Sequence, residues 1–336
     1  MESYYINLTG IGESEVAKED INVDDLKDNE AIIKADYSMI SAGTELSRAF
    51  AIKQGFKYPV RPGYCMVGTI INKGKDIKAE IGDKVFVNAP HASLVRSSNG
   101  IDPQGPLIFK LPDGIDEKEA TAINLLLVAI QGVNFTDVKL GYTVGIFGLG
   151  NIGILAALMY KKLGCKVIGL DLVPQRCELA KKMGLEFVVS GENQKEEIDK
   201  LTNNKGLDIS VDVTGVSQSI ISCIENTKPY GQVLLLGSPR QSYETDAMPI
   251  FSKIHMKNLK VIGGFNKTAP VYAVPGNNNS LENNFYTVCD LIKNKDIDIS
   301  LLISEVVDPK DCKQAYYDLM YNKDKVNCII YDWRNY

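Results

Sequence analysis

The residues with the clearest chemical signature form a glycine-rich segment in the middle of the chain, Gly148-Leu149-Gly150-Asn151-Ile152-Gly153. A GxGxxG segment between a strand and a helix binds a dinucleotide pyrophosphate. Gly148 permits a tight turn, Gly150 lets backbone N–H groups approach the phosphates, and Gly153 permits close helix–strand packing. Asn151 and Ile152 begin the predicted helix, whose N-terminus adds partial positive charge. A cluster of packing glycines without a ligand is the alternative interpretation.

Asp171 and Arg176 bear on which dinucleotide this segment would bind. Asp171 ends the next predicted strand, where a carboxylate accepts hydrogen bonds from the two hydroxyl groups of a ribose. Because a carboxylate repels a 2′-phosphate, the sequence favours NAD over NADP as the cofactor. Arg176 could soften that preference, or it could lie against the adenine as a solvated residue at the start of the next helix.

Alternating apolar runs and helical patterns surround the glycine segment between residues 143 and 264. Each predicted strand is a short run rich in Val, Ile and Leu, as expected for strands that are buried on both faces of a parallel sheet. The predicted strands are 143–148, 166–171, 186–189, 207–213, 232–237 and 259–263, and the predicted helices are 151–163, 174–183, 194–202, 216–227 and 249–257. This alternation predicts an α/β domain with a doubly wound parallel sheet, the Rossmann fold.

The residues on either side of this domain have the pattern of an irregular β-rich domain. Short apolar runs alternate there with turn signals rich in Pro and Gly. The runs are 31–37, 67–71 and 84–87. We therefore expect residues 1–135 and 269–336 to form one β-rich substrate domain, interrupted by a dinucleotide-binding domain at 136–268.

Charge, cysteine content and hydropathy exclude several classes of protein. The 336 residues include 37 Lys and Arg against 42 Asp and Glu, and a net charge of −5 argues against nucleic-acid binding. Seven cysteines without a CxxC pair are typical of reduced thiols in the cytoplasm. The charge-free stretch 140–160 contains the glycine segment, so we expect a strand, a turn and a helix rather than a membrane span. With no basic and apolar leader visible, the sequence predicts a soluble cytoplasmic protein.

Together these features resemble the medium-chain dehydrogenase/reductase family of alcohol and polyol dehydrogenases, over almost the whole chain. The segments that carry the resemblance are Ser41-Ala42-Gly43-Thr44-Glu45, Pro62-Gly63-Tyr64-Cys65-Met66-Val67-Gly68, Gly82-Asp83-Lys84-Val85, the glycine segment and Val211-Asp212-Val213-Thr214-Gly215. The resemblance implies that the β-rich domain is GroES-like. It also implies that two loops lie beside the nicotinamide ribose and carboxamide, with the residues Thr214, Gly215, Gly237, Ser238 and Pro239.

The positions that match the family's zinc ligands hold other residues. Zinc members carry Cys, then His and Glu, then a further Cys or Glu, and the matching residues here are Ala42, Tyr64, Cys65 and Asn124. Only Cys65 could bind zinc, whereas a catalytic zinc has three protein ligands. We therefore expect no metal site. In these segments the chain is most similar to the zinc-less bacteriochlorophyllide-dehydrogenase-like group.

The resemblance also assigns candidate catalytic roles to residues of the β-rich domain. Thr44 matches the hydroxyl that begins the family's proton relay, with a bond to backbone as the alternative. Tyr64 replaces a zinc ligand, and its phenol could donate to a developing oxyanion. Glu45 could orient a neighbour or cap a helix. His91 could exchange protons near neutral pH, although a structural bond in a turn is favoured for it.

The sequence thus predicts an NAD-dependent oxidoreductase that acts without zinc on a secondary alcohol or ketone, such as a sugar or polyol. One alternative is a quinone or enoyl reductase, a class that commonly prefers NADPH. Another is a dinucleotide-binding protein without catalytic activity. The resemblance further implies a homodimer or homotetramer, joined through the strand 259–263 and the segment 265–273.

Overall fold

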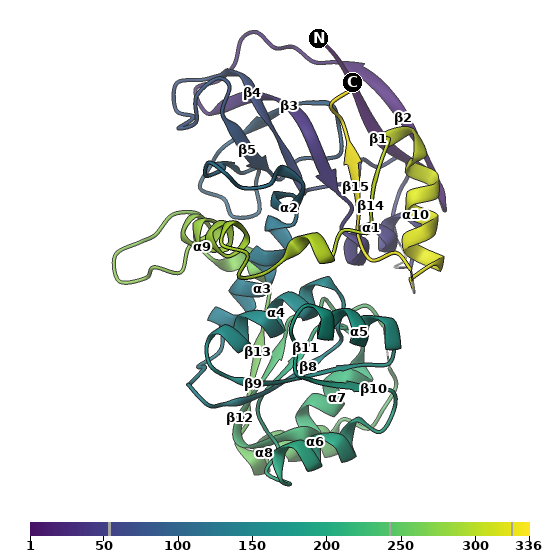
Figure 1. Ribbon diagram of the computed structural model, residues 1–336, viewed down its shortest axis with the longest axis vertical. Coiled ribbons are helices and arrows are strands. Elements are labelled where there is room, and N and C mark those ends of the chain that lie inside the picture. Colours follow the sequence, from purple (N-terminus) through teal and green to yellow (C-terminus); the bar gives the residue numbers. More distant parts are fainter. Residues whose placement is uncertain (53–54, 242, 324) are drawn as a thin grey trace. The chain divides into compact units, whose positions relative to one another are not determined.

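The computed structural model describes every residue except 53, 54, 242 and 324. The chain divides into two compact units, which are labelled by element in Figure 1. Unit 1 comprises Met1–Asn124 and Lys267–Tyr336, and unit 2 comprises Leu125–Asn266. The sequence-based boundaries were 135/136 and 268/269, so the first of them falls later in the chain than the division between the units.

Helix α3 (Ile123–Asn134) accounts for this difference. It lies within residues 1–135, which the sequence predicts to be part of the β-rich domain, but all except its first two residues belong to unit 2. Its glycine packs tightly there, because a Cβ on Gly132 would lie only 2.7 Å from Cδ1 of Leu236. The unit therefore begins with a helix rather than with the first sheet strand.

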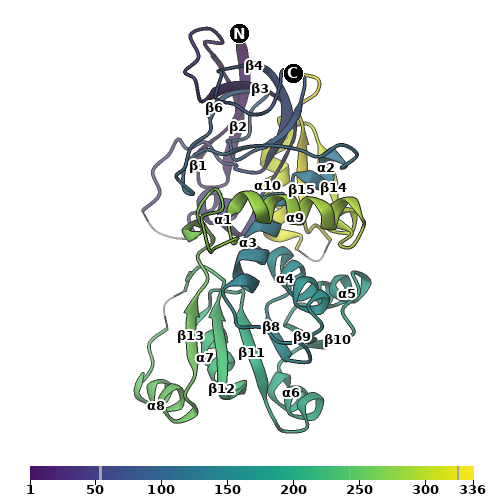
Figure 2. The same cartoon turned by 90° about the vertical axis from the view of Figure 1, so that its left-hand side faces the viewer.

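Unit 2 is built on a parallel sheet with the strand order β10-β9-β8-β11-β12-β13. In chain order its elements are β8 (Thr143–Phe147), α4 (Asn151–Lys162), β9 (Lys166–Asp171), α5 (Pro174–Lys182), β10 (Phe187–Ser190), α6 (Gln194–Thr202), β11 (Leu207–Asp212), α7 (Ser217–Asn226), β12 (Thr227–Leu235), α8 (Met248–Lys257) and β13 (Lys260–Gly263). This is the doubly wound order, and it confirms the predicted fold of this unit. Figure 2 shows the sheet with its helices around it. The strand order reverses between β8 and β11, which is where such sheets bind ligands, at the carboxyl ends of the strands.

The predicted elements of unit 2 agree with the structure to within one or two residues, with β12 as the exception. β12 begins at Thr227 rather than at 232. Its pairing with β11 jumps from Leu207↔Thr227 to Ile209↔Gln232, so the intervening residues form an irregularity in the strand. The sequence signal for the strand started only where the regular, buried ladder resumes.

Unit 1 contains a mixed sheet with the strand order β14-β15-β3-β4-β5-β7, in which β6 also pairs with β3, and a separate antiparallel hairpin of β1 and β2. The strands are β1 (Glu2–Gly10), β2 (Glu13–Asp20), β3 (Glu30–Met39), β4 (Met66–Lys73), β5 (Lys84–Val87), β6 (Leu94–Ser98), β7 (Ile108–Lys110), β14 (Glu305–Val307) and β15 (Ile329–Asp332). The helices are α1 (Ala42–Ala49), α2 (Glu117–Ala120), α9 (Leu281–Lys293) and α10 (Cys312–Tyr321), with short 3-10 turns at Asn266–Thr268, Ile299–Leu301 and Pro309–Asp311. The final strand β15 pairs with β3, so the C-terminal part of the chain adds β14 and β15 to the sheet that β3 to β7 form.

The charge-free stretch 140–160 contains β8, the glycine turn and most of α4. Among the residues that the structure describes, no helix has the length and apolar character that crossing a membrane would require.

Candidate functional site

The glycine segment forms the turn between β8 and α4. Asn151 and Ile152 open the helix, and Gly150 is its N-cap residue. A Cβ on Gly153 would lie 1.9 Å from the carbonyl oxygen of Gly148, so the helix packs directly on the turn. A Cβ on Gly150 would meet no atom within 4 Å. The space beside Gly150 is therefore open, next to the helix N-terminus where such folds bind a phosphate.

Asp171 ends β9, and its buried carboxylate holds two backbone N–H groups. Oδ2 accepts a hydrogen bond from the N–H of Leu149 (2.7 Å), and Oδ1 accepts one from the N–H of Val173 (2.8 Å). Nη1 of Arg176 lies 3.6 Å from Oδ2. A carboxylate offers about four lone-pair sites, so about two remain for the hydroxyl groups of a ribose. Asp171 thus fixes the glycine turn, and Arg176 places a cation beside it.

Asp212 organises the loops that follow β11 and β12. Its fully buried carboxylate accepts hydrogen bonds from the hydroxyls of Thr214 (2.7 Å) and Ser219 (2.8 Å) and from the N–H of Gly215 (2.9 Å). Its carbonyl oxygen accepts one from the N–H of Gly237 (2.8 Å). Both loops are therefore anchored at the end of one strand.

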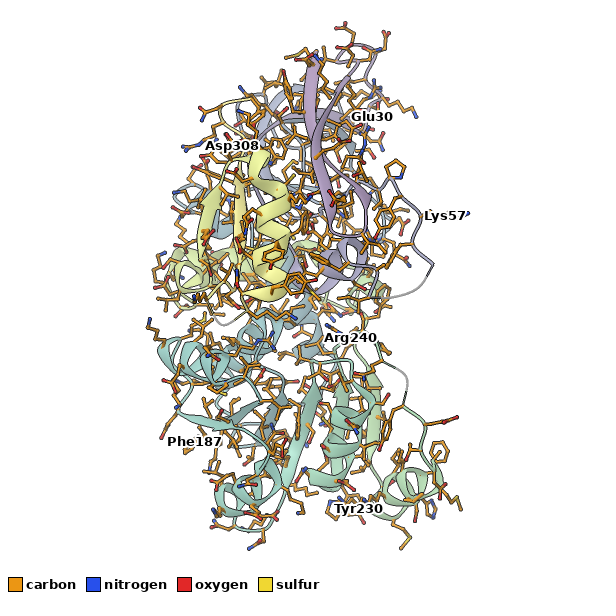
Figure 3. The ribbon with its side chains drawn as sticks, turned by 90° about the vertical axis from the view of Figure 1, so that its right-hand side faces the viewer. Glu30, Lys57, Phe187, Tyr230, Arg240 and Asp308 are labelled. Atoms are coloured by element: carbon orange, nitrogen blue, oxygen red, sulfur yellow. The ribbon has the colours of Figure 1, made fainter. Side chains whose placement is uncertain are left out.

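The two loops also lie against each other. Arg240 N–H donates to the carbonyl oxygen of Gly215 (3.0 Å), and a Cβ on Gly215 would lie 2.0 Å from the carbonyl oxygen of Ser238. Figure 3 shows Arg240 at this end of unit 2 and Tyr230, which precedes the regular part of β12, at the opposite end. The residues expected beside the nicotinamide thus lie together at the carboxyl edge of the sheet: Thr214, Gly215, Gly237, Ser238 and Pro239.

Glu45 carries a fully buried carboxylate in unit 1 that receives three hydrogen bonds. Oε1 accepts one from the N–H of Ser41 (2.7 Å), and Oε2 accepts one from the hydroxyl of Tyr316 (2.7 Å) and one from Nε2 of His91 (3.0 Å). Burying a carboxylate is costly unless it is hydrogen-bonded, and these donors compensate it. Glu45 thereby joins α1 to α10 and to the loop that carries His91.

His91 is equally buried, and its partners define its tautomer. Nδ1 lies 2.7 Å from Oγ of Ser38, and Nε1 of Trp333 donates to the same oxygen (2.8 Å). An indole N–H can only donate, so Ser38 accepts from Trp333. A carboxylate can only accept, so Nε2 of His91 carries the hydrogen that is donated to Glu45. With both nitrogens bonded and no exposed surface, His91 and Glu45 position other groups; direct proton exchange with a substrate, considered for His91, does not fit this placement.

Three hydroxyl groups gather at the N-terminus of α1. The hydroxyl of Tyr64 is bonded to Oγ of Ser41 and lies 3.1 Å from Oγ1 of Thr44. Ser41 is buried, Tyr64 is half-buried and Thr44 is exposed, so the cluster opens at Thr44. Burial, together with the neighbouring Cys65 and Glu45, raises the pKa of the Tyr64 phenol well above its usual value. The phenol therefore stays protonated near neutral pH, where it can donate a hydrogen bond but cannot act as a base.

Gly63 holds the backbone that carries Tyr64. Its φ is +103°, and a Cβ there would lie 2.6 Å from the backbone nitrogen of His91. Only glycine fits this position, so the buried His91 network fixes the start of the Tyr64 segment.

Known proteins similar to this chain are dehydrogenases. The model of the family described as zinc-binding dehydrogenase matches residues 151–274. L-threonine 3-dehydrogenase of Alteromonas mediterranea is 29% identical over 233 residues, which are 61% of this chain and 67% of that protein. D-guloside 3-dehydrogenase of Shigella flexneri is 29% identical over 207 residues, which are 57% of this chain and 58% of that protein. These matches confirm the predicted resemblance to the medium-chain dehydrogenase/reductase family.

A solved structure shows that this fold extends over the whole chain. Galactitol-1-phosphate dehydrogenase from Escherichia coli superimposes with a TM-score of 0.83 over 98% of this chain and 99% of that protein, at 20% sequence identity. The predicted combination of a Rossmann sheet with a GroES-like domain is therefore confirmed.

The donor atoms at the family's zinc position do not fit a zinc ion. Ala42 has no donor atom, and Tyr64 offers a protonated phenol. Burial raises the pKa of the Cys65 thiol well above its usual value, which disfavours the thiolate that zinc binds. Within the part of the chain that the structure describes, no group of three or more His, Cys, Asp or Glu side chains could hold a metal ion. Residues 151–274, which match the zinc-binding dehydrogenase model, include none of these positions.

Sequence reasoning missed several residues that organise the site, among them Ser38, Asp212, Tyr316 and Trp333. Asp212 had a local signal, because it ends a buried strand two positions before Thr214 and can accept bonds from the turn that follows. Tyr316 and Trp333 had none, since they reach Glu45 and Ser38 from the far end of the chain.

Alanine substitutions at Gly150 and Gly153 distinguish space that a bound dinucleotide would fill from space that the protein itself fills. Gly150→Ala should leave the melting temperature unchanged and weaken NADH binding about tenfold or more, because its Cβ enters space that only the phosphates would fill. Gly153→Ala should lower the melting temperature, because its Cβ overlaps the Gly148 carbonyl oxygen. Gly100→Ala, whose Cβ would meet only the backbone nitrogen of Asp102 at 4.0 Å, is the control and should change neither quantity. Calorimetric titration and thermal melts measure both, and unchanged NADH affinity in Gly150→Ala would contradict the assignment.

Proposed function

We propose that this chain is an NAD(H)-dependent oxidoreductase that transfers a hydride between the nicotinamide and a secondary alcohol or its ketone, without a catalytic zinc. The observation that carries this proposal is the joint placement of the glycine turn, Asp171 and the Asp212-anchored loops at one edge of the parallel sheet. The nicotinamide, when bound, supplies or accepts the hydride. The chain itself binds the dinucleotide and positions the alcohol or carbonyl group. It also accepts the proton that an alcohol loses or supplies the proton that a carbonyl oxygen gains.

The preference for NAD over NADP rests on charge near the adenosine ribose. A 2′-phosphate beside Asp171 would place like charges close together, and Arg176 would offset part of that repulsion. Structures of this fold have been solved with NADP, for a protein of Sinorhizobium meliloti, and with NADH, for a protein of E. coli. The fold alone therefore does not determine whether NAD or NADP binds, and the local charges support NAD.

Arg176→Gln tests this preference without disturbing the glycine turn. The wild type should bind NADH at least about tenfold more tightly than NADPH. Arg176→Gln should weaken NADPH further and leave NADH within about twofold, because the neutral side chain no longer offsets a 2′-phosphate. Substitution of Asp171 is less clean, because this carboxylate also holds the N–H groups of Leu149 and Val173. Equal affinity of the wild type for both dinucleotides, measured by calorimetry, would contradict the proposed preference.

The substrate class is proposed from the relatives. Those proteins are named for L-threonine, guloside, sorbitol and xylulose, compounds that carry a secondary alcohol or a ketone beside other polar groups. We propose that this chain acts on a sugar, a polyol or a related small molecule. L-threonine and sorbitol with NAD, and D-xylulose and D-fructose with NADH, are the first compounds to assay by nicotinamide absorbance. Tight NADH binding without turnover of any of them would instead favour a non-catalytic dinucleotide-binding protein.

We also propose that the protein is cytoplasmic and has small molecules rather than nucleic acid or membrane as its partners. All seven cysteines are free and buried, which suits a reducing compartment. A net charge of −5 supports the absence of nucleic-acid binding.

A second copy of the chain is the proposed protein partner, in a homodimer or a homotetramer. β13 ends the strand order of the unit 2 sheet, and Val261 in it is 43% exposed. Helix α8 buries none of its residues, and Phe251 and Met256 on it are 63% and 77% exposed. An edge strand with unpaired backbone groups beside exposed apolar side chains pairs readily with another copy of itself.

Val261→Arg should separate the copies. A charged side chain in the paired edge should convert the wild-type oligomer to a monomer while NADH binding stays within about twofold. Sedimentation velocity measures the oligomer. A wild-type protein that sediments as a monomer, or a variant that stays assembled, would contradict this interface.

A further inference from the structure

A cavity of about 440 Å³ lies within unit 1, lined by the β1–β2 hairpin, by β6 and by the loops near residues 61, 88–92 and 106. This volume is typical of small-molecule sites, which usually measure about 300–1,000 Å³. Most of the wall is apolar, and the apolar lining residues include Ile21, Pro90, Ala92, Leu94 and Pro106. Every lining residue belongs to unit 1, and none of them is assigned to the dinucleotide.

Arg96 is one of two arginines that line this cavity, and its guanidinium is saturated by the protein. Its five N–H groups donate to Glu30 and to three backbone carbonyl oxygens, those of Asn22, Asp24 and Asp25. A guanidinium has no further donors. Arg96 therefore holds the chain around residues 22–30 in place and has no N–H group left for a ligand.

Arg61, the other arginine of the cavity, uses only part of its guanidinium on the protein. Nη1 and Nη2 each donate to one oxygen of Glu19 (2.5 and 2.7 Å), and the guanidinium carbon lies 3.7 Å from the centroid of the Tyr5 ring. If the Tyr5 hydroxyl is counted as a third acceptor, two of the five N–H groups remain within the part of the chain that the structure describes. The Arg61 side chain is 42% exposed, so these groups are accessible to a ligand.

We propose that this cavity binds a small organic anion that carries an apolar group. Its carboxylate or phosphate binds Arg61, and its apolar group packs against the wall to which Ile21, Pro90 and Leu94 contribute. Guanidinium groups form bidentate hydrogen bonds with either kind of oxyanion. This inference goes beyond the proposed function, because it assigns a second ligand site in which the nicotinamide has no part.

Glu19 limits the affinity of such an anion. Its carboxylate and the oxyanion of the ligand share one guanidinium, so the two anions repel each other. Both can bind because the N–H groups of arginine lie along more than one edge of a planar group. We therefore expect a dissociation constant on the order of 1 mM rather than nanomolar affinity.

The wall of the cavity also adjoins the buried Glu45 network. Pro90 and Ala92 line the cavity and flank His91, whose carbonyl oxygen accepts a hydrogen bond from the N–H of Ile6 in β1 (3.0 Å). A ligand in the cavity would contact this loop as well as the hairpin. Because it would bind the folded chain and not the unfolded one, it should raise the melting temperature.

Hexanoate and hexyl phosphate are the probes, and hexanamide is the neutral compound of matched length. In calorimetric titrations of the whole chain, hexanoate should bind about tenfold or more tightly than hexanamide, which lacks the charge. It should exceed acetate by a similar factor, because acetate lacks the apolar group. Hexanoate and hexyl phosphate should each raise the melting temperature at saturating concentration.

Two substitutions should change the affinity for hexanoate in opposite directions. Arg61→Gln should weaken it about tenfold or more, because the guanidinium is lost. Glu19→Gln should strengthen it about threefold or more, because the competing carboxylate becomes neutral while the arginine stays. Arg334→Gln is the matched control and should keep the affinity within about twofold. Arg334 also donates to a carboxylate, that of Asp332, and lies over a tyrosine ring, that of Tyr37, but it does not line the cavity.

Four outcomes would overturn the proposal. Neither hexanoate nor hexyl phosphate binds, or Arg61→Gln leaves the affinity for hexanoate unchanged. Hexanamide binds as tightly as hexanoate, or acetate and inorganic phosphate bind as tightly as the hexyl compounds. Weaker binding in Glu19→Gln as well as in Arg61→Gln would equally contradict it, because the ion pair would then act only as a structural unit.

Melting curves without ligand identify a variant that does not fold. Arg61→Lys then replaces Arg61→Gln, and it should weaken hexanoate binding about threefold or more because the charge stays and the bidentate geometry is lost. NADH affinity is measured in parallel and should stay within about twofold in every variant. A wild type that binds no NADH would overturn the proposed function and leave the anion site standing.

Discussion

The buried carboxylate of Glu45 is the interaction on which the GroES-like unit depends. It receives hydrogen bonds from the Ser41 backbone, from Tyr316 on α10 and from His91. Through His91 and Ser38 the network continues to Trp333 after the last strand. Removing any one donor would leave a buried charge under-compensated, which costs more than the bond itself contributes. The carboxylate therefore fixes α1, and with it the hydroxyl groups at its N-terminus.

Asp171 and Asp212 have the corresponding role in the Rossmann unit. Each ends a buried strand and accepts bonds from the loop that follows it. Asp171 also reaches Leu149 in the glycine turn, so it joins the loops after β8 and β9. These carboxylates shape the edge of the sheet before any ligand binds, which is the preorganisation that tight and oriented binding needs.

The sequence predicts a structural feature of this protein when the residues that form it lie close together in the chain. The parallel sheet and the glycine turn have local signals, since an apolar run, a GxGxxG segment and an acidic strand end lie within one βαβ unit. The hairpin of β1 and β2 was missed because β2 alternates charged residues and exposes much of its surface. The Glu45 network has no local signal, because His91, Tyr316 and Trp333 come from distant segments. His91 was expected to bond within a turn, whereas its ring bonds to Ser38 and Glu45.

The chain is similar to the family in fold but differs from its zinc-binding members in the side chains at the zinc position. The fold is kept, yet Ala42 and Tyr64 stand where metal ligands stand in zinc members, and a hydroxyl cluster with a protonated phenol takes their place.

Hydride transfer without zinc is tested most directly by following deuterium from C4-deuterated NADH into the product of D-xylulose or D-fructose reduction. The experiment uses protein dialysed against EDTA, with zinc quantified by mass spectrometry. We expect deuterium on the product carbon at less than about 0.1 zinc per chain, a level that cannot supply each active site with a metal ion. Transfer that appears only after zinc is restored would contradict this expectation.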